Sequence, residues 1–152
     1  MKAVFQRVTE ASVTVDCQQI AAIGSGVLLL VGVCDGDTEQ EAALLAKKVA
    51  ELRVFSDADD KMNLSVLDIG GSVLAVSQFT LCANTARGRR PDFMQAAKPA
   101  VAQPLFDYFV GCLRQNGVED VQTGMFGADM KVRLLNDGPV TILLDTDTWK
   151  RG

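Results

Sequence analysis

Histidine is absent from this chain of 152 residues. Imidazole is the general base of Ser-His-Asp and Cys-His hydrolases and a ligand of H-E-x-x-H zinc sites, so these three classes are excluded. Any chemistry must use hydroxyls, amides, carboxylates, backbone groups or the substrate itself. We therefore expect no cofactor and no metal, and a site built from carboxylates alone is the one metal class left open.

Long apolar runs are also absent, and no segment is long and apolar enough to span a membrane. The segment Met1–Arg7 becomes polar too early to supply the apolar core of a signal peptide. These two observations predict a cytoplasmic protein with no membrane partner. The length fits one domain over residues 1–152.

Cysteine is scarce and scattered along the chain. The four cysteines form no C-x-x-C pair, and three of them lie in apolar surroundings: Cys17, Cys34, Cys82 and Cys112. We interpret them as reduced, structural thiols. A catalytic cysteine is the alternative, but a thiolate usually needs a histidine or a strongly positive environment to form.

Basic residues do not dominate, and a net charge of −4 argues against a general nucleic-acid binder with a large basic face. Arg87, Arg89 and Arg90 nevertheless lie together in residues 84–98, a loop longer than most connections. Arginine suits bidentate contacts with phosphate. The loop is therefore either a solvated or disordered surface segment or a functional contact.

Alternating and fully apolar segments predict a domain rich in β-strands. The expected strands cover residues 2–8, 12–16, 18–23, 27–33, 53–56, 72–76, 130–134 and 139–144.

Two other segments have helical periodicity. Thr38–Glu41 is a capping box that opens the first helix. The second covers Leu105–Leu113 and stops at Asn116, and Pro104 predicts either a start near that residue or a bend there. Together the segments predict an α+β fold with a mainly antiparallel, partly barrel-like sheet and two helices packed on it.

Ser77-Gln78-Phe79-Thr80 follows an apolar strand at the point where that strand ends. If the four residues stay extended, Gln78 and Thr80 point to one side and Ser77 and Phe79 to the other. A hydroxyl, an amide and strand-end N–H groups can orient an ester and stabilise an oxyanion. The same residues are also compatible with a polar strand end that only satisfies its own backbone.

Gly138-Pro139 lies between two expected strands, within Asn136–Thr141. Glycine reaches dihedral angles closed to other residues, and an X-Pro bond is the one peptide link in which the cis form is cheap. The dipeptide is either an ordinary turn or a rigid tip that presents two backbone carbonyls.

These short motifs occur in the order and spacing of one family. Gln6-Arg7-Val8, Ser77–Leu81, Thr123-Gly124 with Phe126, Ala128–Met130 and Asn136–Thr141 carry the likeness. Over residues 1 to about 145, the chain resembles the D-aminoacyl-tRNA deacylases, also called D-tyrosyl-tRNA deacylases. Residues 146–152 form a tail that the likeness leaves unassigned and that is compatible with a flexible end.

The resemblance implies an enzyme that hydrolyses the ester of D-aminoacyl-tRNA, and of glycyl-tRNA mischarged on a non-cognate tRNA. It implies a homodimer in which a cis Gly138-Pro139 bond enters the site of the opposite subunit and leaves no room for an L side chain. The implied catalytic residues are Ser77, Gln78, Phe79 and Thr80, and the implied substrate-binding residues are Gly138, Pro139, Arg7, Phe126 and Met130.

The resemblance leaves two mechanisms open. Thr80 acts as a nucleophile, or the 2′-hydroxyl of the terminal ribose helps to activate water while the protein positions the ester. The missing histidine favours the second mechanism, because an alcohol without an adjacent base is a weak nucleophile at neutral pH. Two other functions remain as alternatives, a non-catalytic nucleic-acid-binding dimer and a small-molecule esterase with Thr80 as nucleophile.

Overall fold

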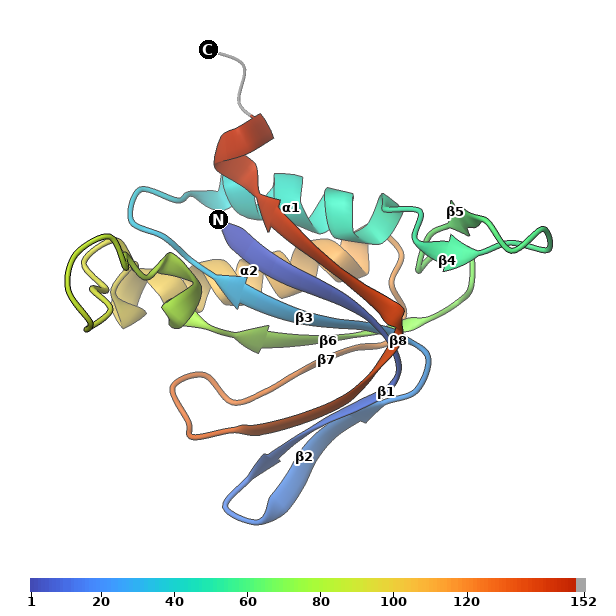
Figure 1. Ribbon diagram of the computed structural model, residues 1–152, viewed down its shortest axis with the longest axis horizontal. Coiled ribbons are helices and arrows are strands. Elements are labelled where there is room, and N and C mark those ends of the chain that lie inside the picture. Colours follow the sequence, from blue (N-terminus) through green and yellow to red (C-terminus); the bar gives the residue numbers. More distant parts are fainter. Residues whose placement is uncertain (150–152) are drawn as a thin grey trace.

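A computed structural model describes residues 1–149 (Figure 1). The described elements are β1 (Lys2–Val15), β2 (Gln18–Ile23), β3 (Gly26–Gly32), α1 (Glu39–Glu51), β4 (Phe55–Ser56), β5 (Met62–Leu64), β6 (Ser72–Ser77), the 3-10 helix η1 (Phe79–Cys82), α2 (Pro99–Gln115), β7 (Val121–Thr123), β8 (Lys131–Asp145) and the 3-10 helix η2 (Thr146–Trp149).

The long strand β1 organises the main sheet. Its first half pairs with β3, its second half pairs with β2, and β8 pairs along its whole length, all antiparallel. Because one strand serves two neighbours in turn, the sheet curls into the partly barrel-like shape of Figure 1. The α+β class with two helices is therefore confirmed, although the sequence divided both β1 and β8 into two strands each.

The sheet is mixed, because β3 pairs with β6 and β6 pairs with β7 in parallel. A parallel pair needs a crossover connection, and these two crossovers contain α1 and α2. Both helices lie side by side over one face of the sheet (Figure 1). Between the layers lies a core that includes Phe5, Leu29, Leu45, Phe109 and Leu113, each fully buried.

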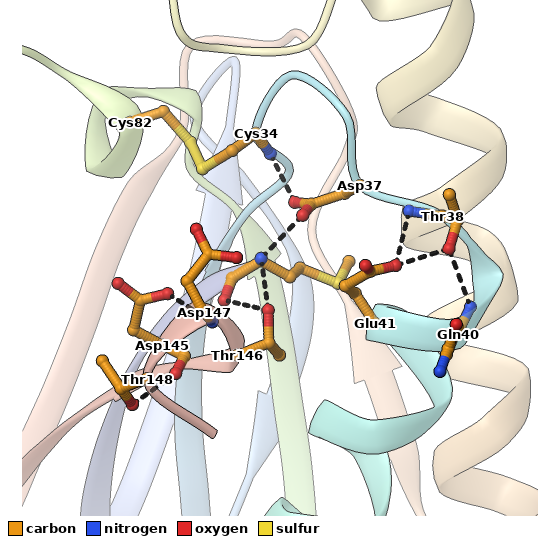
Figure 2. Close-up of polar contacts among 11 residues, drawn as sticks. Cys34, Asp37, Thr38, Gln40, Glu41, Cys82, Asp145, Thr146, Asp147 and Thr148 are labelled. Atoms are coloured by element: carbon orange, nitrogen blue, oxygen red, sulfur yellow. Dashed lines mark hydrogen bonds and ion pairs between the residues drawn. A yellow bond between two sulfur atoms is a disulfide. The ribbon is translucent and has the colours of Figure 1, made fainter. Parts of the chain in front are cut away.

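The first helix begins as the capping box predicts. The Thr38 hydroxyl accepts a hydrogen bond from the Gln40 N–H, and the Glu41 carboxylate accepts one from the Thr38 N–H at 2.9 Å (Figure 2). The second helix begins at Pro99, so a start near Pro104 is wrong. Pro104 lies inside the helix, where it removes one backbone hydrogen bond. The packing of the apolar face of α2 offsets this loss.

The N-terminus is anchored by Asp37 and by the first residue of η2. The α-amino group of Met1 donates hydrogen bonds to Asp37 at 2.9 Å and to the buried Thr146 hydroxyl at 2.7 Å. Residues 146–149, which the sequence left unassigned, thus belong to the packed structure, and the rest of the expected tail lies outside the described residues. No helix in the described part of the chain is long and apolar enough to cross a membrane.

Cys34 and Cys82 form a disulfide in the structure (Figure 2), so the expectation of four reduced thiols is wrong for this pair. Cys34 follows β3 and Cys82 ends η1, which follows β6. Because β3 and β6 pair in parallel, the segments beyond their ends lie close, and the two Cα atoms are 5.9 Å apart. Because the two cysteines are 48 residues apart in the sequence, their proximity could not be predicted from the sequence. Cys17 and Cys112 are free.

Candidate active site

The Ser77–Thr80 motif lies at the end of the buried strand β6, as the sequence predicts, but it does not stay extended. Ser77 is the last residue of β6, and the chain turns at Gln78 into η1. The Gln78 N–H still donates to the Val31 carbonyl at 2.7 Å, which holds the turn against the end of β3. The expected alternation of side chains is therefore replaced by a tight 3-10 turn.

This turn leaves polar groups at the surface. The Gln78 side-chain amide donates to the Thr80 hydroxyl at 2.5 Å, and both Phe79 and Thr80 are exposed. The first N–H groups of a short helix have no acceptor within that helix, so those of Phe79 and Thr80 are available as donors. These two N–H groups are candidate donors to a carbonyl oxygen of a substrate.

A cavity of about 540 Å³ opens beside the turn. Ser77, Gln78 and Phe79 form one wall of it, while Phe93, Phe126 and Met130 come from elements far away in the sequence. Thr80 is not part of the lining, but its hydroxyl is hydrogen-bonded to Gln78, which is. Its mainly apolar walls and polar edge suit a flat, partly apolar group with one reactive polar end.

Phe126 and Met130 are half-buried and serve both the cavity and the core. Phe126 packs against Phe106 of α2 with ring centroids 6.5 Å apart, and Met130 packs against a second cluster of buried apolar residues that includes Val13 and Leu28. Gly124 approaches the Met130 sulfur so closely that an added Cβ would lie 2.5 Å from it. Strand packing and a place in the cavity wall are thus compatible for these two residues.

Phe93 is one of the wall residues that sequence reasoning missed. Its ring meets that of Phe79 edge to face, with centroids 5.0 Å apart. Phe93 lies in the irregular segment after the arginine residues, where no periodicity marks a side chain as inward-facing. Only its aromatic character, next to a loop suspected of function, could have pointed to it.

Gly138-Pro139 does not connect two strands but bulges from the single strand β8. Gln6 of β1 pairs with Thr141 and Val8 pairs with Asn136, so the intervening residues of β8 face Arg7 alone. The Gly138-Pro139 peptide bond is cis, and both residues are exposed. The interpretation as an ordinary turn is therefore wrong, and the dipeptide is an exposed tip on a paired strand.

Hydrogen bonds fix the ends of this tip. The Asn136 side chain accepts from the Val140 N–H at 3.0 Å and donates to the Thr141 hydroxyl at 2.8 Å. Gly138 has a φ of +132°, which side-chain-bearing residues rarely adopt, and an added Cβ would lie 2.9 Å from the Arg7 guanidinium. Glycine at position 138 is thus required by the backbone and by its neighbour.

The Arg7 side chain holds the tip in place through hydrogen bonds to backbone carbonyls. Its guanidinium donates to the Asp137 carbonyl at 2.9 Å and to the Val54 carbonyl at 2.6 Å. The Asp137 carboxylate lies 3.7 Å from Arg7 Nε, and the arginine side chain is only 12% exposed. Arg7 therefore does more than pack on its strand, because its side chain links the tip to Val54 in the segment after α1.

Within one chain the tip and the Ser77–Thr80 turn do not meet. Arg7, opposite the tip, pairs with Val27 on β3, whereas Ser77 pairs with Val31. Four residues along a strand cover about 13 Å, and β8, β1, β3 and β6 are separated by three spacings of about 4.8 Å. In Figure 1 the bend of β8 and η1 accordingly lie at opposite ends of the sheet.

Acidic and thiol side chains do not assemble into a metal site. Among residues 1–149, no group of three or more Cys, Asp or Glu side chains is arranged to hold a metal ion. The cavity lining includes the Asp129 carboxylate beside Ser77 and Gln78.

These features define a class, a small α+β domain whose strand-end polar turn faces an aromatic cavity without a histidine base. The sequence matches the family described as D-Tyr-tRNA(Tyr) deacylase over residues 4–145. It is 56% identical to the D-aminoacyl-tRNA deacylase of Chloroflexus aurantiacus over 96% of this chain and 91% of that protein. It is 59% identical to the D-aminoacyl-tRNA deacylase of Roseiflexus sp. strain RS-1 over 99% of this chain and 96% of that protein. The chain belongs to the D-Tyr-tRNA(Tyr) deacylase family.

Two solved structures share the fold. One, described as "c-Myc DNA Unwinding Element Binding Protein", is 44% identical, with a TM-score of 0.91 over 95% of this chain and 98% of that one. The other, described as a probable eukaryotic D-amino acid tRNA deacylase, is 18% identical. Its TM-score is 0.80 over 94% of this chain and 97% of that one. The second likeness concerns the fold alone.

Proposed function

We propose that this chain hydrolyses the ester bond of D-aminoacyl-tRNA and releases the free amino acid and tRNA. The observation that carries the proposal is the juxtaposition of the Ser77–Thr80 turn with the aromatic cavity in a member of this family. The terminal nucleoside is flat and partly apolar, which fits walls made by Phe79, Phe93 and Phe126. The ester then lies at the polar rim.

Positioning and electrostatics do the catalytic work. The N–H groups of Phe79 and Thr80 stabilise the oxyanion that forms when water adds to the ester carbonyl. The bond between the carbonyl carbon and the ribose oxygen then breaks, and a proton returns to that oxygen. Because the chain has no histidine, we assign activation of the water to the 2′-hydroxyl of the terminal ribose rather than to a side-chain base.

Selection of the D-form comes from the Gly138-Pro139 tip of a second copy of the chain. The tip lies too far from the Ser77–Thr80 turn to act on it within one protomer. β8 pairs only with β1 among the described strands and exposes Leu135 and Leu143, which suits a homodimer interface. The tip carbonyls then bind the substrate α-amino group and exclude an L side chain. Glycine has no side chain, so glycyl-tRNA passes the same filter.

Rates of deacylation of D-tyrosyl-tRNA and L-tyrosyl-tRNA test the activity directly. We expect rapid hydrolysis of the D-form and hydrolysis of the L-form at the rate of the uncatalysed reaction. A non-catalytic nucleic-acid binder, a function favoured by the likeness to the DNA-unwinding-element protein, would accelerate neither. A small-molecule esterase would hydrolyse simple amino acid esters equally well.

Complementation between two inactive variants tests the shared site. One variant loses the pocket through Phe79→Ala, and the other loses the tip brace through Arg7→Ala. A mixed dimer regains one intact site only if the tip acts across the interface. Mixtures that stay as inactive as each variant alone would show that the tip and the pocket belong to the same protomer.

We further propose that residues 1–152 act as one domain and that the protein works in the cytoplasm. The continuous core between the sheet and the two helices supports the first statement. The need to reach newly charged tRNA supports the second. Fractionation of cells that produce the protein from its own gene tests the location.

A further inference from the structure

Backbone hydrogen bonds close the loop in the 84–98 segment and anchor it to the rest of the protein. The backbones of Asn84 and Asp92 exchange two hydrogen bonds, of 2.7 and 2.9 Å, so residues 85–91 form a small loop with paired ends. The Asp35 N–H donates to the Gln95 carbonyl at 2.7 Å, which ties the returning strand of the loop to the segment after β3. The loop is therefore held in place rather than solvated along its length.

Three guanidinium groups point from this loop without a partner in the protein. Arg87, Arg89 and Arg90 are exposed, and none of them has an ion pair or a hydrogen bond within the described structure. Residues 84–98 contain four basic residues and one acidic residue, a net charge of +3, whereas the whole chain carries −4. The rest of the protein therefore carries −7, and this loop is an isolated positive site.

The arginine loop adjoins the cavity directly. Phe93 follows the paired end of the loop and meets the Phe79 ring, and both residues line the cavity wall. Ala96 and Ala97, at the end of the same segment, line it as well. The segment that carries the three arginines therefore forms part of the wall around a nucleoside bound in the cavity.

We propose that Arg87, Arg89 and Arg90 bind the phosphates of the single-stranded 3′ end of tRNA, next to the nucleoside that carries the amino acid. This inference rests on the proposed function, because that function places the terminal nucleoside in the cavity. The exposed, unpaired guanidiniums form phosphate contacts that fix the register of the strand and read no base. The overall negative charge of the protein then repels tRNA elsewhere and favours this approach.

Salt dependence of kcat/KM on D-tyrosyl-tRNA tests the contacts. Each phosphate neutralised on a single strand contributes about 0.7 to the slope of log affinity against log salt. We expect Arg87→Gln, Arg89→Gln and Arg90→Gln each to flatten the slope by about 0.7, and the triple variant by about 2. When salt is raised from about 50 to about 200 mM, kcat/KM of the native protein should then fall by a factor roughly 20 times larger than that of the triple variant.

Two controls isolate the effect. Lys47→Gln removes one exposed charge from the outer face of α1 and should leave the slope unchanged. The D-tyrosyl ester of adenosine has no phosphate, so the native protein and the triple variant should hydrolyse it at equal rates. Equal rates on this ester also show that the triple variant is folded.

The outcomes separate this inference from the function on which it rests. If the native protein hydrolyses neither D-tyrosyl-tRNA nor the adenosine ester, the proposed function fails. If it hydrolyses both, and the triple variant keeps the native salt slope on D-tyrosyl-tRNA, the arginine contacts are wrong. A loss of rate on the adenosine ester as large as that on D-tyrosyl-tRNA would also overturn them.

Discussion

The Arg7 guanidinium donates a hydrogen bond of 2.9 Å to the backbone carbonyl of Asp137, the residue directly before Gly138-Pro139. A second bond of 2.6 Å to the Val54 carbonyl fixes the guanidinium from the other side. Arginine presents several donors in a rigid fork, whereas lysine presents a flexible point charge. The position of the tip therefore depends on a planar group that bridges two backbone oxygens.

Replacing Arg7 by Lys should misplace the tip while the fold persists. We expect kcat/KM on D-tyrosyl-tRNA to fall about 100-fold and discrimination against L-tyrosyl-tRNA to weaken, because a shift of about 1 Å has such effects at a reacting centre. Loss of one bond to a buried carbonyl should lower the free energy of unfolding by about 1–3 kcal/mol. Steady-state kinetics with both stereoisomers and denaturant unfolding measure these effects.

Arg53→Lys is the matched control for this substitution. Arg53 is exposed and makes no hydrogen bond or ion pair with another described residue, so the change should alter neither kinetics nor stability. An Arg7→Lys variant that loses stability but keeps its rate and stereoselectivity would show that Arg7 acts only in folding.

The strands and the first helix could be predicted because each has a local cause. The alternation of Ser12–Asp16, the apolar run of β3 and the Thr38–Glu41 box are all visible within a few residues. β7, with only Val121–Thr123, lacks such a signal, because it becomes a strand only where β6 offers it a partner. The sequence analysis therefore predicts no element there.

The candidate site was predictable as a set of segments, but its geometry was not. Both motifs are contiguous in the sequence, so their residues could be chosen without a structure. The turn at Gln78 depends on a hydrogen bond to Val31, and the bulge at Gly138 depends on Arg7 from another strand. Long-range contacts of this kind also placed Phe93 in the cavity wall and joined Cys34 to Cys82.

Reduction of the Cys34–Cys82 disulfide should destabilise the protein. The bond links residues 48 positions apart, and closing a loop of that length stabilises the folded state by roughly 4 kcal/mol through the entropy of the unfolded chain. We expect a dithiol reductant to lower the free energy of unfolding by about this amount. The Cys34→Ala and Cys82→Ala double variant should be insensitive to the reductant.

Thiol alkylation checks which cysteines are joined. In denaturant without reductant, mass spectrometry should find label on Cys17 and Cys112 only, and after reduction it should find label on all four cysteines. Cys17→Ser serves as control, because this exposed thiol is free and its loss should not alter the response to reductant. Four labelled cysteines before reduction would contradict the bond.

Asp57 should make stability depend on pH in the acid range. Its carboxylate accepts hydrogen bonds from the N–H groups of Lys61 and Asp59 and from the Asn63 amide. These bonds, led by that of Lys61, hold the pKa of Asp57 below its usual value. A lowered pKa in the folded state means that the stabilisation is complete above about pH 4 and is lost as pH falls through the folded-state pKa.

Thermal unfolding from pH 6 to pH 2 measures this dependence. Asp57→Asn should have a lower Tm than the native protein at pH 6, and the difference should shrink at the acid end. Asp60→Asn is the control, because the Asp60 side chain makes no hydrogen bond with another described residue. A difference between Asp57→Asn and the native protein that stays constant down to pH 2 would show that the carboxylate charge is not the cause.

Thr80 distinguishes the two catalytic mechanisms. Its hydroxyl accepts a hydrogen bond from the Gln78 amide, and the chain has no histidine that could act as its base. A hydroxyl in this setting is a poor nucleophile, whereas its backbone N–H survives any side-chain substitution. We therefore expect Thr80→Ala to keep kcat on D-tyrosyl-tRNA within about tenfold of the native value, a smaller loss than the roughly 100-fold or more that removal of a proton-transferring group causes.

Thr80→Ser is the matched variant, because it keeps the hydroxyl and removes only the methyl group. If Thr80 positions the ester, the Ser and Ala variants should both remain active, and rapid quenching should trap no acyl-enzyme. If Thr80 is the nucleophile, Thr80→Ala should be inactive with unchanged tRNA binding, while Thr80→Ser retains activity. That second pattern would overturn assignment of water activation to the ribose 2′-hydroxyl, because the chain itself would then supply the attacking oxygen.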